Sequence, residues 1–134
     1  MIEFDRDFRM SSYPLRVHSG KNALGQLPAE VKRNRAKRAF IICGRTVSRK
    51  TDLIRNMQAL LGDACVGVYD EMGKDTPLPD VLAARDAARE AGADLLIGVG
   101  GGSVIQGVRI VAILLAEKGS PYELMTQYPE DGHA

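Results

Sequence analysis

Residue types that carry much of protein chemistry are scarce in this chain of 134 residues, which has no tryptophan, two cysteines and two histidines. Cys43 and Cys65 each lie in an apolar segment with the character of a strand, so we expect small core residues and not a disulfide framework or a metal knuckle. His18 and His133 do not have metal-ligand spacing with another histidine. The sequence therefore predicts no metal site within these residues, and free thiols indicate a reducing compartment.

The chain also lacks an excess of one charge and a long apolar run. Lys and Arg number 18 against 17 Asp and Glu, which gives a formal net charge of +1 and no general attraction to nucleic acid or an anionic membrane. No apolar stretch approaches the length of a membrane span, and residues 1–7 contain no secretory hydrophobic region. We expect one soluble, cytoplasmic domain over residues 1–134 without a membrane or nucleic-acid partner, and we interpret the acidic stretch 70–80 as a solvated loop.

What the chain does contain is an alternation of apolar strands and helices, at a hydrophobic content of 45%. Continuous apolar runs, typical of strands buried on both faces of a parallel sheet, predict strands at 39–43, 64–69 and 95–99, after a short strand at 15–18. Helical spacing of apolar residues predicts helices at 23–32, 51–61, 77–91 and 104–116. The predicted fold class is α/β, a Rossmann-like parallel sheet with helices on both faces and ligands at the carboxyl ends of its strands.

The last predicted helix is apolar nearly all round, since Gln106 and Arg109 are its only strongly polar residues. A helix of this kind is normally covered on all sides. Residues 117–134 are polar, contain Pro121 and Pro129, and do not supply that cover. We therefore expect the chain to be part of a larger protein or to associate tightly with a partner, including a second copy of itself.

Three consecutive glycines, Gly100, Gly101 and Gly102, follow the predicted strand 95–99 and lead through Ser103 into that apolar helix. Glycines let the backbone approach a ligand closely, and the amides and positive dipole end of a helix favour an anion, so the pattern predicts a phosphate cradle. The alternative is a tight strand-to-helix turn packed against a neighbour. It is less favoured because each glycine costs about 0.5–1 kcal/mol relative to alanine in regular structure. Ser103 stands where the dinucleotide fingerprint has its third glycine.

Four stretches in this order resemble a known family: residues 16–24, the apolar strand ending at Gly44, the helix from Pro77 that leads to Ala93-Asp94, and Gly100–Ser103. From about residue 13 to 122 the chain resembles the N-terminal, cofactor-binding half of the iron-containing (group III) alcohol dehydrogenases, which include maleylacetate reductases. The resemblance implies the dehydroquinate synthase-like N-terminal fold. It also implies hydride transfer between a nicotinamide cofactor and an alcohol or carbonyl compound.

In that family the triple-glycine loop holds the pyrophosphate and nicotinamide side of the cofactor, a role that the resemblance gives to Gly100–Ser103 and, one turn on, to Gln106. Gln106 replaces the aspartate that the family commonly has, and Arg109 replaces a lysine. Glutamine can hydrogen-bond an amide or a ribose hydroxyl but cannot act as a base near neutral pH. The resemblance places the catalytic iron, held by one aspartate and three histidines, in a C-terminal helical half, so this chain alone is expected to be inactive and to contain no catalytic residue.

Gly44 bears on the choice between NAD and NADP. Relatives that use NAD often place an aspartate at the end of this strand, where it accepts hydrogen bonds from the adenosine ribose. Glycine removes that carboxylate, and Arg45 and Thr46 follow directly, so a guanidinium could clamp a 2′-phosphate in bidentate fashion. We expect a preference for NADP. The alternative is that Gly44 only ends the strand and Arg45 is solvated.

Two other functions remain open at this point. In the first, the chain is a relative of dehydroquinate synthase or glycerol-1-phosphate dehydrogenase, enzymes whose fold is similar and which share a glycine-rich loop. Ser103 and the missing aspartate at position 106 count against this alternative. The other is a non-catalytic nucleotide- or phosphate-binding module, which Gln106 favours.

Overall fold

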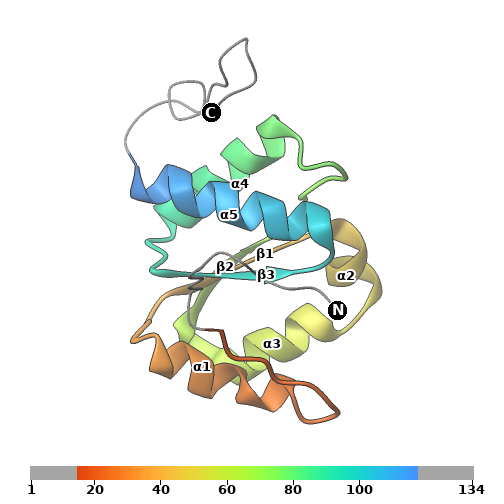
Figure 1. Ribbon diagram of the computed structural model, residues 1–134, viewed down its shortest axis with the longest axis vertical. Coiled ribbons are helices and arrows are strands. Elements are labelled where there is room, and N and C mark those ends of the chain that lie inside the picture. Colours follow the sequence, from red (N-terminus) through yellow and green to blue (C-terminus); the bar gives the residue numbers. More distant parts are fainter. Residues whose placement is uncertain (1–14, 118–134) are drawn as a thin grey trace, which may run out of the picture.

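The computed structural model describes residues 15–117, which form a parallel three-stranded sheet with helices on both of its faces (Figure 1). The strands are β1 (Ala39–Cys43), β2 (Cys65–Tyr69) and β3 (Leu95–Val99), in the order β2-β1-β3. Cys43 of β1 pairs with Val99 of β3, so these two strands end level with each other at the carboxyl edge of the sheet. The predicted fold class and the three principal strands are therefore confirmed.

The helices within these residues lie in two layers. Helices α1 (Leu27–Arg33) and α3 (Leu53–Leu61) cover one face of the sheet, while α4 (Leu78–Glu90) and α5 (Gly102–Ala116) cover the other (Figure 1). Helix α2 (Arg45–Lys50) and the short 3-10 helices η1 (Leu24–Gln26) and η2 (Gly62–Ala64) complete the set. Within residues 15–117 no helix combines the length and the apolar character needed to span a bilayer.

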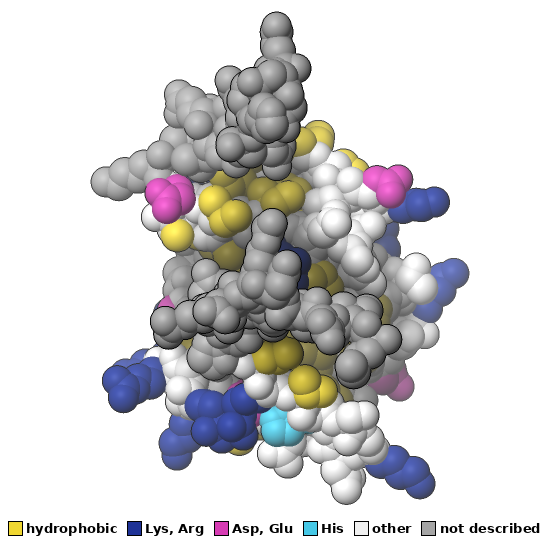
Figure 2. All heavy atoms as spheres, viewed as in Figure 1, with side chains coloured by type: hydrophobic (Ala, Val, Ile, Leu, Met, Phe, Trp, Pro, Cys, Tyr) yellow, Lys and Arg dark blue, Asp and Glu magenta, His cyan; other side chains and the backbone are white. Residues whose placement is uncertain are grey.

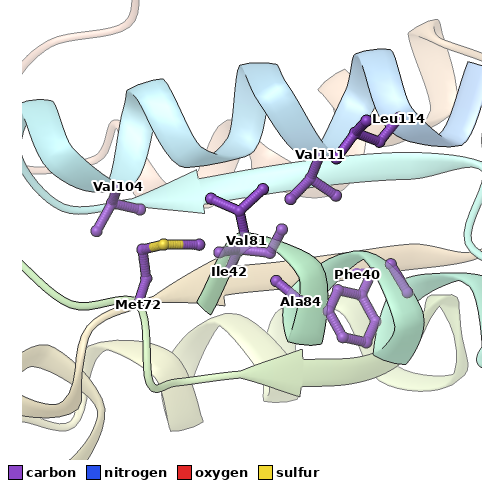
Figure 3. Packing of buried hydrophobic residues seen from close by; sticks show 9 residues of the cluster. Phe40, Ile42, Met72, Val81, Ala84, Val104, Val111 and Leu114 are labelled. Carbon is purple, nitrogen blue, oxygen red and sulfur yellow. The ribbon is translucent and has the colours of Figure 1, made fainter. Parts of the chain in front are cut away.

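Strand β1 is apolar at every position because it is buried on both faces. Phe40 and Ile42 pack against α4 and α5, in the cluster that Figure 3 shows with Val81, Val111 and Leu114. Ala39, Ile41 and Cys43 face the opposite layer, formed by α1 and α3. Full burial of one isoleucine side chain contributes about 1.5–3 kcal/mol, so this strand anchors both layers of the fold.

The predicted strand at residues 15–18 is wrong. Leu15 and Val17 are 83% and 77% exposed, and the segment has no strand structure. The intervening polar side chains bind α1 instead: Arg16 Nε donates to Glu30 Oε1 at 2.9 Å, and His18 Nε2 lies 2.9 Å from the same oxygen. The segment therefore attaches to a helix through its polar residues and leaves its apolar ones outside.

Helix α2 was not expected from the sequence, and the helix predicted at 51–61 begins two residues late, at Leu53. Residues 45–50 have no apolar face that would predict a helix. Thr51 has an extended backbone, with φ −134° and ψ 166°, and its hydroxyl donates to the carbonyl of Val47. Thr51 therefore separates α2 from α3.

The two cysteines are free thiols in the core layer between the sheet and α1 and α3, as predicted. Burial raises the pKa of the Cys43 thiol to about 11, with a smaller contribution from Asp70. At the other end of the sheet, Asp94 accepts hydrogen bonds from the backbone N–H groups of Lys37 and Arg38, which lowers the pKa of its carboxyl. This carboxylate links the start of β1 to the start of β3.

Helix α5 keeps an uncovered apolar side within the described part of the chain. Ile105, Ile110 and Ile113 remain exposed, Ile113 by 53%, and Figure 2 shows hydrophobic side chains on the surface above the sheet, where α5 lies in Figure 1. A groove of about 480 Å³ runs beside it, with Leu96 of β3 and Val108, Ala112 and Leu115 of α5 among its lining residues. The expectation that a partner or a further part of the protein covers this helix stays a prediction.

Candidate functional site

The parallel register brings the two predicted ligand-binding segments together. Gly44 follows Cys43 and Gly100 follows Val99, and these two strand residues are partners in neighbouring strands. After β1 the chain continues into α2 and then α3 on one face, whereas after β3 it enters α5 on the other face. Adjacent strands whose connections leave on opposite faces form a topological switch point, the place where open α/β sheets bind ligands.

Gly100 is required by the fold itself. Its φ of +148° lies in a region that L side chains rarely adopt, and a Cβ there would stand 2.9 Å from Val104 Cγ2. Val104 is buried at the first turn of α5 and cannot easily move away. The alternative interpretation, a tight turn packed against a neighbour, therefore explains this glycine.

Gly101 and Gly102 are not explained in that way. Among the described residues, a Cβ at either position would meet nothing within 4 Å, and Gly101 has a φ of −87°, which any residue can adopt. Both residues are exposed at the carboxyl edge of the sheet. Neither packing within the described residues nor backbone geometry requires glycine here, and the open backbone permits close approach of a ligand.

The start of α5 is suited to an anion. Gly101 is its N-cap residue and offers no side-chain cap, and the first turn contains no acidic residue. The first amides of a helix have no partner within that helix, and the dipole of a helix of 15 residues adds positive potential at this end. The backbone around Gly101 and Gly102 can therefore accept a phosphate at short range.

Ser103, the next residue, is held by the loop between β2 and α4. Its Oγ accepts a hydrogen bond from the backbone N–H of Asp75 at 3.0 Å, and its carbonyl accepts one from the hydroxyl of Thr76 at 2.7 Å. The hydroxyl hydrogen of Ser103 is not used in either bond. Gln106 is exposed one turn further along α5. Sequence reasoning missed Asp75 and Thr76, because no local pattern links them to Ser103.

The arginines beside Gly44 are paired with acids that follow β2. Arg45 Nη2 lies 3.6 Å from Glu71 Oε1, and Arg49 Nη2 lies 3.4 Å from the same oxygen. Arg49 Nε is also 3.6 Å from Asp70 Oδ2, which accepts a hydrogen bond from the Ser48 hydroxyl at 2.9 Å. Two carboxylates thus offset two guanidinium groups. The interpretation of these acids as a solvated loop omits their ion pairs with Arg45 and Arg49. Their position directly after a strand was the sequence signal that could have indicated these pairs.

The other two residues predicted at this edge differ in exposure, since Thr46 is exposed and Gly44 is half-buried. Thr46 stands at the second position of α2, and Gly44 has a φ of −91°, which does not require glycine. The backbone N–H of Met72 donates to the carbonyl of Cys43 at 3.2 Å, which fixes the loop after β2 against the end of β1. All three strand ends therefore contribute to one site.

Within residues 15–117 no group of three or more His, Cys, Asp and Glu side chains is arranged to hold a metal ion. His18 contacts Glu30 of α1, and His133 lies outside the described residues. The chemistry that the described part of the site supports is binding of a phosphorylated ligand.

Comparisons with known proteins point to one family. Residues 14–133 match the family model of the iron-containing alcohol dehydrogenases. The chain is 37% identical to maleylacetate reductase 2 of Cupriavidus pinatubonensis, over 85% of this chain and 33% of the relative. It is 34% identical to long-chain-alcohol dehydrogenase 1 of Geobacillus thermodenitrificans, over 81% of this chain and 28% of the relative.

A solved structure from Ralstonia eutropha JMP134, assigned as an alcohol dehydrogenase, matches the fold with a TM-score of 0.74 and 31% identity. The match covers 84% of this chain and 31% of that one. The chain thus spans about a third of the length of the curated relatives and the solved structure that it matches.

Proposed function

The chain belongs to the iron-containing alcohol dehydrogenase family, and on this basis we propose that residues 1–134 form the single nicotinamide-dinucleotide-binding domain of a larger oxidoreductase. The complete protein transfers a hydride between NAD(P) and an alcohol or carbonyl compound. The observation that carries the proposal is the pair Gly101 and Gly102, glycines that the fold does not need, at a switch point and at the start of a long helix.

In this proposal each part of the site has one binding task. The pyrophosphate accepts hydrogen bonds from the first-turn amides of α5, which Gly101 and Gly102 leave accessible. Ser103 donates its free hydroxyl hydrogen, and Gln106 offers an amide to a ribose hydroxyl or to the nicotinamide side. The bound cofactor supplies the hydride. In this proposal the chain itself binds and orients the cofactor; within residues 15–117 no group of three or more His, Cys, Asp and Glu side chains is arranged to hold a metal ion.

Iron, or another divalent metal, belongs in this proposal to the part of the protein beyond these residues. The described residues do not offer the ligands for it. The isolated chain is therefore expected to bind cofactor without turnover. The apolar side of α5 then serves for association with that further part or with a second copy. The free thiols of Cys43 and Cys65 agree with a cytoplasmic protein.

The cofactor proposed is NADP, held by Arg45 at its 2′-phosphate. Arg45 is 64% exposed, and its pair with Glu71, at 3.6 Å, is of the surface kind that contributes about 0–1 kcal/mol. A bidentate guanidinium-phosphate contact is stronger, so the side chain can exchange its carboxylate partner for a phosphate. The absence of a carboxylate at Gly44 removes the repulsion that would oppose this exchange.

Replacing Arg45 by alanine is expected to weaken NADPH binding by about tenfold, because a charge-assisted contact is lost, and to leave NADH binding unchanged. Calorimetric titration of both cofactors measures this. Glu71→Gln is the opposite control: it frees Arg45, leaves Arg49 paired with Asp70, and is expected to tighten NADPH binding by about threefold without affecting NADH. Equal losses for NADPH and NADH in Arg45→Ala would refute the 2′-phosphate contact and leave the dehydrogenase proposal standing.

The substrate class is tested on the full-length protein. Since the named relatives are a maleylacetate reductase and a long-chain-alcohol dehydrogenase, maleylacetate and a long-chain aldehyde are the two probes. We expect loss of the reduced-nicotinamide absorbance with one of them, and removal of that activity by a metal chelator. Cofactor binding without turnover of any alcohol or carbonyl compound would favour the second candidate, a non-catalytic nucleotide-binding module. Gln106, an uncharged residue that cannot serve as a base, is the observation that keeps this candidate open.

A further inference from the structure

The loop between β2 and α4 contains two consecutive residues in an unfavourable backbone conformation. Asp75 has a φ of +62° and Thr76 a φ of +54°. Aspartate tolerates the left-handed region, but a β-branched residue such as threonine is rare there. Backbone of this kind persists only where the surrounding structure holds it, and it is concentrated at functional sites.

The first two turns of α5 hold this loop. The Asp75 amide and the Thr76 hydroxyl both bond to Ser103, and the Thr76 amide donates to the carbonyl of Gly73 at 3.3 Å. One turn later, buried Met72 packs so tightly on Gly107 that a Cβ there would lie 2.9 Å from the methionine sulfur. These contacts therefore join the loop to the start of α5.

We propose that Thr76 is a positioning residue for the nucleotide site, an inference that rests on the proposed cofactor binding at Gly101–Ser103. Its hydroxyl holds the carbonyl of Ser103, while the neighbouring Asp75 amide occupies a lone pair of the Ser103 oxygen and leaves the hydroxyl hydrogen for the phosphate. Thr76 thereby keeps Ser103 and the first-turn amides of α5 in the arrangement that the pyrophosphate needs. Cofactor affinity then depends on a loop that belongs to a different strand from the glycine run.

The test compares Thr76→Val with Thr76→Ser in the full-length protein, titrated with NADPH and with NADH. Valine keeps the shape of threonine without its hydroxyl, so both cofactors are expected to bind about threefold to tenfold more weakly, while serine keeps the hydrogen bond and restores affinity. Asn34→Ala is the matched control, because Asn34 donates a similar side-chain bond to the carbonyl of Glu30 at the end of α1. It is expected to lower stability and leave affinity unchanged.

Amide hydrogen exchange at residues 101–105 without ligand gives a readout that does not depend on the cofactor. Faster exchange in Thr76→Val, and wild-type exchange in Thr76→Ser, is expected. Wild-type affinity and exchange in Thr76→Val would overturn the proposal, as would an equal loss of affinity in Asn34→Ala. A wild-type protein that binds neither NADPH nor NADH would overturn the proposed function, and with it a role of Thr76 in nucleotide binding; exchange would then still show whether Thr76 holds the start of α5. If Thr76→Val does not fold, Thr76→Gly replaces it, because glycine adopts this φ without strain.

Discussion

Replacing Gly101 or Gly102 by alanine is expected to leave the fold intact and to weaken nicotinamide cofactor binding strongly. Each new methyl group enters open space among residues 15–117 of the free protein, so none of these residues opposes it. Stability should stay the same or rise by about 0.5–1 kcal/mol, since alanine restricts the unfolded chain more than glycine does. In the complex the methyl group meets the pyrophosphate. An overpacked contact costs about 1–3 kcal/mol, which corresponds to roughly fivefold to 150-fold weaker binding.

Calorimetry with NADPH and NADH, together with urea denaturation of the same samples, measures both effects. The chain offers a matched control in Gly25→Ala, because Gly25 also has open space where its Cβ would stand but lies in η1, on the α1 side of the sheet. That variant should bind as the wild type does. Unchanged affinity in both Gly101→Ala and Gly102→Ala would mean that no ligand approaches this backbone, and the cradle would be refuted.

Gly100→Ala is expected to destabilise the protein by about 2–6 kcal/mol, from two sources of similar size. The strained backbone at φ +148° contributes about 1–3 kcal/mol of this cost. A similar amount comes from overpacking, because the new Cβ lies 2.9 Å from Val104 Cγ2. The midpoint of urea denaturation reports the change.

A double-mutant cycle separates the two causes. Val104→Ala removes the methyl group that the new Cβ would meet, so Gly100→Ala should cost less in that background, with the backbone strain remaining. Wild-type stability of Gly100→Ala would contradict the described backbone. Additive effects of the two changes would show that the steric contact is absent. Of the three adjacent glycines, the fold requires Gly100, and the proposed cofactor binding accounts for Gly101 and Gly102.

The continuous apolar runs at residues 39–43 and 95–99 predicted β1 and β3 correctly, because a strand that packs against helices on both faces has few polar positions. Apolar residues at helical spacing determined α3, α4 and α5 within about two residues of their ends. The strand predicted at residues 15–18 is absent, because contacts of Arg16 and His18 with Glu30 hold this segment against α1. The criterion of apolar spacing missed α2, which has no apolar face.

The sequence by itself therefore determined the α/β class and the glycine run that begins α5, since both follow from local periodicity and from the properties of single residue types. Only the tertiary structure decided that Gly44 and Gly100 end neighbouring strands, that Glu71 offsets Arg45 and that Thr76 holds Ser103. The physical reason is that each of these pairings depends on strand order and register. Strand order and register are set by packing of the whole sheet against its two helix layers. The sequence separation of the paired residues therefore does not reveal the pairings.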